Sequence, residues 1–125
     1  MLILSGLEDW GLLILRIFIG IIFLVHGWGK LSGKNTPGGF RFLGFCESIG
    51  GLAAILGLLT QFASIGFSLI MLGAIYMKIS KWNVRFTFPD KPGWEFDFMV
   101  LGAAIALILL GAGNFSLDAY FGFFP

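Results

Sequence analysis

Four long apolar stretches constrain the fold of this chain more than any other feature of its sequence. They lie at residues 10–29, 42–59, 62–80 and 96–113, and each is about 18–20 residues long. An α-helix rises 1.5 Å per residue, so about 20 residues cross the roughly 30 Å of a bilayer's hydrocarbon core. Because lipid offers no hydrogen-bond partners, backbone that crosses it must be helical. The sequence therefore predicts an all-α fold, a four-helix transmembrane bundle that occupies residues 1–125 as one domain.

The overall composition excludes several other classes of protein. Of the 125 residues, 58% are apolar and 12% are charged, whereas soluble domains carry about 45–50% apolar and about 25% charged residues. A chain of this length cannot hide so much apolar surface from water. Soluble globular, disordered and nucleic-acid-binding proteins are thereby excluded. The formal net charge of +1 predicts no strongly acidic or basic partner.

A single cysteine, Cys46, and a single histidine, His26, limit the chemistry that the chain can carry out alone. One thiol forms no intramolecular disulfide, and there is no C-x-x-C motif for thiol exchange. One imidazole can neither ligate haem from two sides nor build a multi-histidine metal site. The chain also carries no haem, flavin or iron–sulfur motif. We predict no metal site, and any redox reaction would need a bound organic cofactor or a partner subunit.

The basic residues predict the orientation of the bundle. Two loops, at 30–41 and 80–95, share one side of a four-helix bundle and hold or adjoin seven of the eight Lys and Arg residues: Lys30, Lys34, Arg41, Lys78, Lys81, Arg85 and Lys91. The positive-inside rule then places both loops in the cytoplasm and both termini outside, in a multi-pass protein of the inner or plasma membrane. Residues 82–88 alternate apolar and polar side chains, which predicts an extended, half-buried segment.

Glu47 is the deepest acidic residue at this loop end of the bundle. It lies five residues, or about 7–8 Å, inside the second apolar stretch. An unpaired carboxylate at such a depth is strongly destabilising, and His26, Lys30 and Lys78 are within reach as partners. Two interpretations stay open. Glu47 either forms a buried ion pair that fixes helix register, or it handles protons and anchors a ligand.

Other polar residues are expected at the same end. His26 lies near the end of the first stretch, and a neutral imidazole can exchange protons near pH 7; we take His26 and Glu47 as candidate catalytic residues. The candidate ligand-binding residues are Lys30, Lys78, Trp94 and Glu95. Each has a structural alternative: the histidine bonds a neighbouring helix, the lysines reach lipid headgroups, the tryptophan anchors at the interface, and the glutamate suits a helix N-terminus.

Arg16 stands apart, at the opposite end of the bundle. It lies six residues past Trp10, about 9 Å below that interface at helical rise. Its possible partners are Asp118, which follows the fourth stretch on the same side, or Glu8 and Asp9. We predict a structural ion pair between Arg16 and Asp118 that joins the first and fourth helices.

Small residues four positions apart predict where the helices pack closely. The second stretch contains Gly50 and Ala54, and the fourth contains Gly102 and Ala106. Such spacings allow the backbones of two membrane helices to approach each other.

Several segments, taken in order, resemble the DoxX family of membrane proteins. They are Arg16 with the segment HGWGK at 26–30, ESIGG at 47–51, LGLLT at 56–60, GWE at 93–95, and GAGNFSLD at 111–118. The resemblance implies a small four-helix membrane protein. Some members are subunits of thiosulfate:quinone oxidoreductase or associate with membrane oxidoreductase complexes. The family commonly has a histidine in its third helix where this chain reads Met77-Lys78, so chemistry that needs a second imidazole is not expected.

Two functions follow from this resemblance and from the polar residues. In the first, the chain is a small subunit of a membrane redox system, and its polar end binds a quinone or a similar ligand. In the alternative, it is a non-catalytic structural or assembly subunit, with the loop at 80–95 as its docking surface. Both predict other membrane subunits or further copies of the chain as partners. A transporter is disfavoured because no inverted repeat or pair of broken helices is evident.

Overall fold

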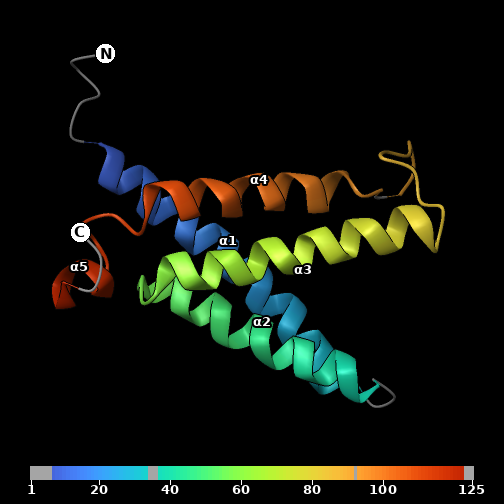
Figure 1. The fold of residues 1–125 in the computed structure, drawn as a ribbon, viewed down its shortest axis with the longest axis horizontal. Helices are drawn as coiled ribbons and strands as arrows, with labels where there is room; N and C mark the ends of the chain where they lie inside the picture. The colour runs from blue at the N-terminus through green and yellow to red at the C-terminus, as the bar shows by residue number, and fades with distance from the viewer. Residues whose placement is uncertain (1–6, 34–36, 92, 123–125) are drawn as a thin grey trace.

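The computed structural model describes residues 7–33, 37–91 and 93–122, and these ranges contain five helices. They are α1 (Glu8–Ser32), α2 (Gly38–Leu56), α3 (Thr60–Ser80), α4 (Glu95–Leu110) and the short α5 (Leu117–Phe121), shown in Figure 1. Three of them, α1, α2 and α3, are long and apolar enough to cross a membrane. The predicted all-α fold of a membrane protein is confirmed.

The fourth helix ends earlier than the sequence predicts. We expected it at 96–113, but α4 stops at Leu110 because Gly111 adopts a φ of +78°. The N–H of Gly111 makes the last helical hydrogen bond, to the carbonyl of Leu107. A positive φ is readily adopted by glycine and ends a helix. A further helix that we did not predict, α5, then begins after Ser116, whose hydroxyl accepts the N–H of Ala119.

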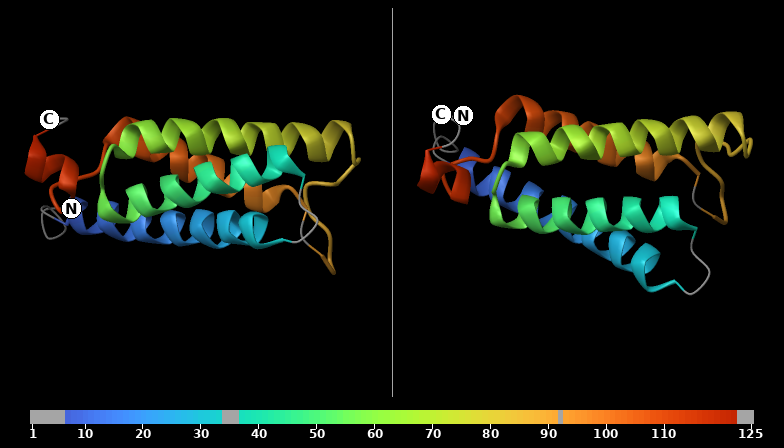
Figure 2. Two further views of the ribbon diagram at one scale, coloured as in Figure 1. Left: turned by 90° about the horizontal axis from the view of Figure 1, so that it is seen from below. Right: turned by 60° about the horizontal axis from the view of Figure 1, so that its bottom comes forward.

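The long helices form two antiparallel pairs, α1 with α2 and α3 with α4 (Figure 2). Glycines allow the backbones of α1 and α2 to touch: a Cβ on Gly20 would lie 2.6 Å from the carbonyl oxygen of Gly51, and one on Gly27 would lie 2.6 Å from that of Gly44. The glycines at this contact are therefore seven residues apart within each helix. The prediction for Gly102 is wrong, since a Cβ there meets nothing within 4 Å; spacing alone does not reveal which helix face a small residue occupies.

The apolar core lies between the two pairs. The rings of Phe23 on α1 and Phe67 on α3 stack with centroids 3.8 Å apart, and both side chains are almost fully buried. Outside the core the usual pattern is reversed, and large apolar side chains point away from the bundle on every long helix. Phe18 is 66% exposed, Phe42 69% and Leu109 78%. Such an apolar outer surface suits a lipid environment.

Arg16 is fully buried and binds the main chain at one end of the bundle. One guanidinium nitrogen, Nη1, donates to the carbonyl oxygens of Ala54 at 3.3 Å and Ile55 at 3.4 Å, and Nη2 donates to that of Phe115. The last carbonyls of a helix have no partner within the helix. Arg16 supplies hydrogen-bond donors to the last carbonyls of α2 and joins the end of α2 to the segment that follows α4.

Asp118 likewise binds backbone instead of Arg16. Its two carboxylate oxygens accept the N–H groups of Leu59 at 2.6 Å and Thr60 at 2.9 Å, so the side chain caps the start of α3. Arg16 and Asp118 therefore do not form the direct ion pair that the sequence predicts, since the salt bridges within 4.0 Å among the described residues lie elsewhere. Unpaired backbone groups at the α2–α3 turn engage both charged side chains.

Candidate functional site

A cavity of about 1150 Å³ lies between the two helix pairs, toward the loops that follow α1 and α3. Figure 1 shows why space is available there, since α2 and α3 diverge from their shared turn. All four long helices line the cavity, mostly with apolar side chains. Its polar lining residues are His26, Lys30, Glu47, Lys78 and Asp97, and Trp82 also lines it.

The first wall carries an ion pair between α1 and α2. Lys30 Nζ lies 2.5 Å from Glu47 Oε1, and the side chain of Glu47 is 2% exposed while that of Lys30 is 31% exposed. The close glycine contacts bring the two residues together: a Cβ on Gly44 would lie 2.7 Å from the Cβ of Lys30. Of the three partners that the sequence allowed for Glu47, the structure shows Lys30.

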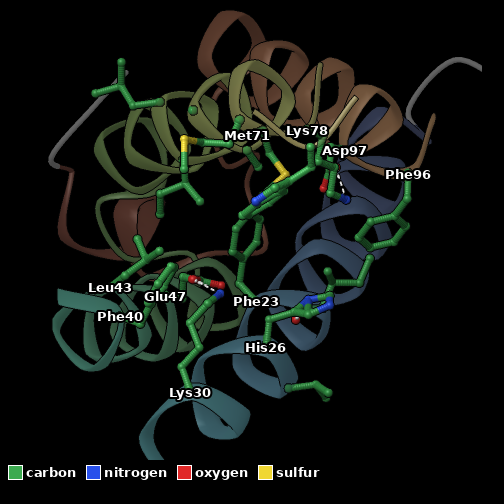
Figure 3. A pocket seen from close by; sticks show the side chains of 18 of the residues that line it. Phe23, His26, Lys30, Phe40, Leu43, Glu47, Met71, Lys78, Phe96 and Asp97 are labelled. Atoms are coloured by element: carbon green, nitrogen blue, oxygen red, sulfur yellow. Dashed lines mark hydrogen bonds and ion pairs between the residues drawn. The ribbon is translucent and has the colours of Figure 1, made fainter. Parts of the chain in front are cut away.

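The second wall carries an ion pair between α3 and α4. Lys78 Nζ lies 2.5 Å from Asp97 Oδ2, with side-chain exposures of 30% and 8%. Figure 3 shows the two pairs on opposite sides of the cavity, with Phe23 between them. Sequence reasoning placed Asp97 at this end but not among the site residues. No apolar stripe in the sequence marks Asp97, because α4 is apolar on every side. Only the structure shows that Asp97 shares its buried face with Val100, Ala104 and Leu107.

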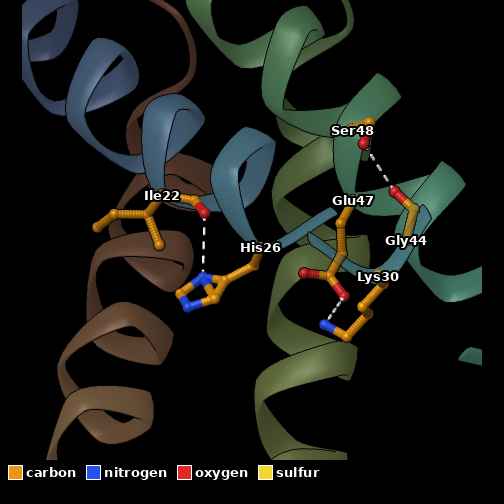
Figure 4. A network of polar contacts seen from close by, with 6 residues as sticks. All are labelled: Ile22, His26, Lys30, Gly44, Glu47 and Ser48. Atoms are coloured by element: carbon orange, nitrogen blue, oxygen red, sulfur yellow. Dashed lines mark hydrogen bonds and ion pairs between the residues drawn. The ribbon is translucent and has the colours of Figure 1, made fainter. Parts of the chain in front are cut away.

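His26 presents one ring nitrogen as a hydrogen-bond acceptor. Its Nδ1 lies 3.0 Å from the carbonyl oxygen of Ile22, one turn earlier in α1 (Figure 4). A carbonyl oxygen only accepts, so Nδ1 carries the proton and Nε2 of the neutral ring is the acceptor. The ring also lies 5.7 Å from that of Phe96, centroid to centroid, and both residues line the cavity.

Two predicted ligand-binding residues, Trp94 and Glu95, lie outside the cavity lining. The ring of Trp94 packs edge-on against Phe86 with centroids 4.6 Å apart, and Glu95 accepts a hydrogen bond from the hydroxyl of Thr87 at 3.1 Å. The segment 82–88 forms no strand, and the carbonyls of Arg85 and Phe86 accept the N–H groups of the two residues. Trp94 and Glu95 thus hold this loop against the start of α4.

The cavity combines hydrogen-bond donors and acceptors with balanced charge. Each ammonium group bonds one carboxylate oxygen, which leaves further N–H donors on side chains that are about one-third exposed. The side chains of Glu47 and Asp97 are almost fully buried. The two pairs carry no net charge, and most of the remaining lining is apolar. This arrangement suits an uncharged molecule with oxygen acceptors and an apolar body. Within the described residues, no three His, Cys, Asp or Glu side chains are grouped to hold a metal ion.

Comparison with known proteins gives consistent similarities. The DoxX family model matches residues 11–80. "Putative oxidoreductase CatD" of Bacillus subtilis (strain 168) is 32% identical over 123 residues, covering 88% of this chain and 86% of that protein. "Inner membrane protein YqjF" of Escherichia coli (strain K12) is 28% identical over 126 residues, covering 90% of this chain and 92% of that protein. No solved structure matches the chain.

Proposed function

This chain belongs to the DoxX family, and we propose that it is a small membrane subunit of a redox system that binds a quinone-type molecule between its two helix pairs. The observation that carries this proposal is the cavity with a lysine donor on each of two opposite walls. A quinone has two carbonyl oxygens on opposite sides of an uncharged ring. The relative from Bacillus subtilis carries the word oxidoreductase in its name, which agrees with a redox role.

Each cavity residue has a distinct task in this proposal. Lys30 and Lys78 donate hydrogen bonds to the carbonyl oxygens, and the buried Glu47 and Asp97 hold the ammonium groups in place. Conversion of a quinone to its hydroquinone takes up two electrons and two protons, and the reverse reaction releases them. In the direction of oxidation, His26 Nε2 accepts the two hydroxyl protons one after the other and, because the side chain is exposed, releases each of them to solvent. A partner redox protein supplies or removes the electrons, since the chain carries no motif for a redox centre of its own.

Equilibrium binding of a radiolabelled quinone to the protein in lipid nanodiscs tests the proposal. We expect the wild type to bind, and the charge-balanced double variant K30M/E47Q to bind at least about tenfold more weakly, because a hydrogen bond from a charged group contributes about 1.5–3 kcal/mol. The matched control is K81M. Lys81 is an exposed lysine at the end of α3, outside the cavity lining. Equal binding by all three proteins, or none by the wild type, contradicts the proposal.

The loop after α3 favours a second function, that of a structural or assembly subunit. Arg85 and Lys91 lie over the ring of Phe88, with the charged groups 5.4 and 4.6 Å from its centroid, and Phe86 beside them is 44% exposed. Aromatic side chains and arginine are enriched where proteins contact one another. If this function holds, R85A/F86A releases a partner that co-purifies in mild detergent while K30M/E47Q retains it.

We also propose the orientation in the membrane. The described ends of α1 and α3, with the loop that follows α3, carry the basic residues and face the cytoplasm. The α2–α3 turn, the start of α1 and α5 lie at the opposite end of the bundle (Figure 2) and face outward. This orientation rests on the distribution of charge.

A further inference from the structure

Gly73 is a helical glycine that no packing contact explains. It lies within α3, where glycine is less favourable than every residue except proline, and it is exposed. A Cβ built on it meets nothing within 4 Å, in contrast to Gly20 and Gly27, whose missing side chains allow α1 to touch α2. Its φ is not positive either. What distinguishes Gly73 is that it lines the cavity.

The surroundings of Gly73 are apolar and open toward lipid. Across from α3, the cavity is lined on α2 by Phe40 and Leu43, and Leu69 lies one turn before Gly73 on α3. Phe40 is 47% exposed and Leu69 65% exposed. Residues between α2 and α3 therefore line the cavity and are also exposed on the outer surface of the bundle. All of them are apolar, so a hydrocarbon chain that passes between the two helices would meet no polar group.

The size of the cavity indicates a ligand larger than a ring. Sites for drug-sized molecules measure about 300–1000 Å³, and this cavity measures about 1150 Å³. Its polar groups are confined to the two ion pairs and His26, so a ligand with its head there leaves the apolar part of the cavity unfilled.

We propose that Gly73 keeps a lateral slot open between α2 and α3, through which the apolar tail of the ligand passes from the cavity into the bilayer. The ligand class is a long-chain amphiphile with an uncharged, hydrogen-bonding head, and it reaches the site from the membrane. This inference rests on the proposed function, since it takes the head to bind between Lys30 and Lys78. Gly73 acts here as a specificity-determining residue for the tail.

The test compares two leucine substitutions on one face of α3. Gly66 lies seven residues before Gly73, has open space around its Cβ as well, and does not line the cavity. Binding of a tailless benzoquinone and of the same ring with a decyl tail is measured for wild type, G73L and G66L in nanodiscs, with ligand expressed as its mole fraction in lipid. For each ligand, the dissociation constant of the variant is divided by that of the wild type, so that the different partitioning of the two ligands into lipid cancels.

We expect the wild type and G66L to bind both ligands alike, because a tail gains little on moving from lipid to an apolar slot. G73L should bind the tailless ring as the wild type does and the decyl compound at least tenfold more weakly. The graded variant G73A, whose methyl group fits the open space, should retain both.

The outcomes separate the two proposals. If the wild type binds neither ring, the proposed function fails. If the wild type binds both and G73L does so equally well, the lateral slot is refuted while the proposed function stands. A G73L variant that loses both ligands equally also refutes the slot, because Gly73 then borders the head.

Discussion

Glu47 and Lys30 form an ion pair whose members are buried to very different extents. The Glu47 side chain is 2% exposed and the Lys30 side chain 31% exposed. Removal of the lysine leaves a carboxylate buried without a counter-charge, whereas removal of the carboxylate leaves an ammonium group that can turn toward the cavity. The loss in the free energy of unfolding when the pair is broken should therefore depend on which of the two residues is changed.

We expect K30M to lower the free energy of unfolding by about 3–5 kcal/mol, the range for breaking a buried pair. E47Q should lower it less, by about 1.5–3 kcal/mol, the loss of one hydrogen bond to a charged group. The double variant K30M/E47Q should recover most of the K30M loss. Titration with a denaturing detergent in mixed micelles measures all three, with K81M as the exposed control. Equal costs for the two single variants would contradict the asymmetry.

Sequence reasoning placed individual side chains correctly where helix position decides them. His26, Lys30, Glu47 and Lys78 were expected at one end of the bundle, and all four line one cavity. Their roles stay predictions. Reasoning failed for Arg16, where proximity suggested a carboxylate partner, because the competing acceptors are backbone carbonyls of a turn. Pattern analysis of side chains does not count such groups.

At the scale of helices, contact between α1 and α2 depends on which glycines face the partner. Gly27 and Gly29 are two residues apart in α1, but only Gly27 lies at the interface. A Cβ on Gly27 would lie 2.4 Å from Ser48 Oγ and 2.6 Å from the carbonyl oxygen of Gly44, and one on Gly29 meets nothing within 4 Å. The backbone oxygen cannot move without separating the helices.

The two positions therefore give a matched pair of substitutions with opposite expected signs. G27A should lower the free energy of unfolding by about 1–3 kcal/mol through overpacking. G29A should leave it unchanged or raise it by up to about 1 kcal/mol, because alanine favours helix over glycine. Unfolding in mixed micelles again provides the measurement. The described packing of α1 on α2 is incorrect if G27A is as stable as G29A.

Helix boundaries also show what apolar length can and cannot predict. The four long helices were expected because lipid demands continuous helical backbone. The end of α4 at Leu110 was not, since residues 111–113 are small and uncharged and their composition resembles a helix interior. The positive φ of Gly111 and Gly113 decides this boundary. A glycine in a membrane sequence can lie at a helix–helix contact, end a helix, or face open space, and the sequence alone does not distinguish these three cases.

At the scale of the whole molecule, polar contacts join the helix pairs at one end. There Asp9 at the start of α1 accepts two hydrogen bonds from Asn114, which follows α4, and the N–H of Asp118 donates to the carbonyl of Gly57 at the α2–α3 turn. At the cavity end each ion pair joins helices of a single pair. Contact between pairs in the middle is apolar, chiefly the stacked Phe23 and Phe67. Among the described residues, fewer polar contacts therefore hold the two helix pairs together at the cavity end than at the opposite end.

The uneven placement of charge provides a test of how this molecule lies in the membrane. In the described residues, Arg16 is the basic residue at the end opposite the cavity, and it is buried there. Lys81, Arg85 and Lys91 are exposed at the cavity end. Basic residues near membrane helices are retained in the cytoplasm. With Cys46, which is exposed, changed to serine, single cysteines at the exposed positions Ser80 and Ala119 report on opposite ends. An impermeant maleimide should label A119C in intact bacterial cells and S80C only after lysis. Labelling of S80C but not of A119C in intact cells would show that the bundle has the opposite orientation.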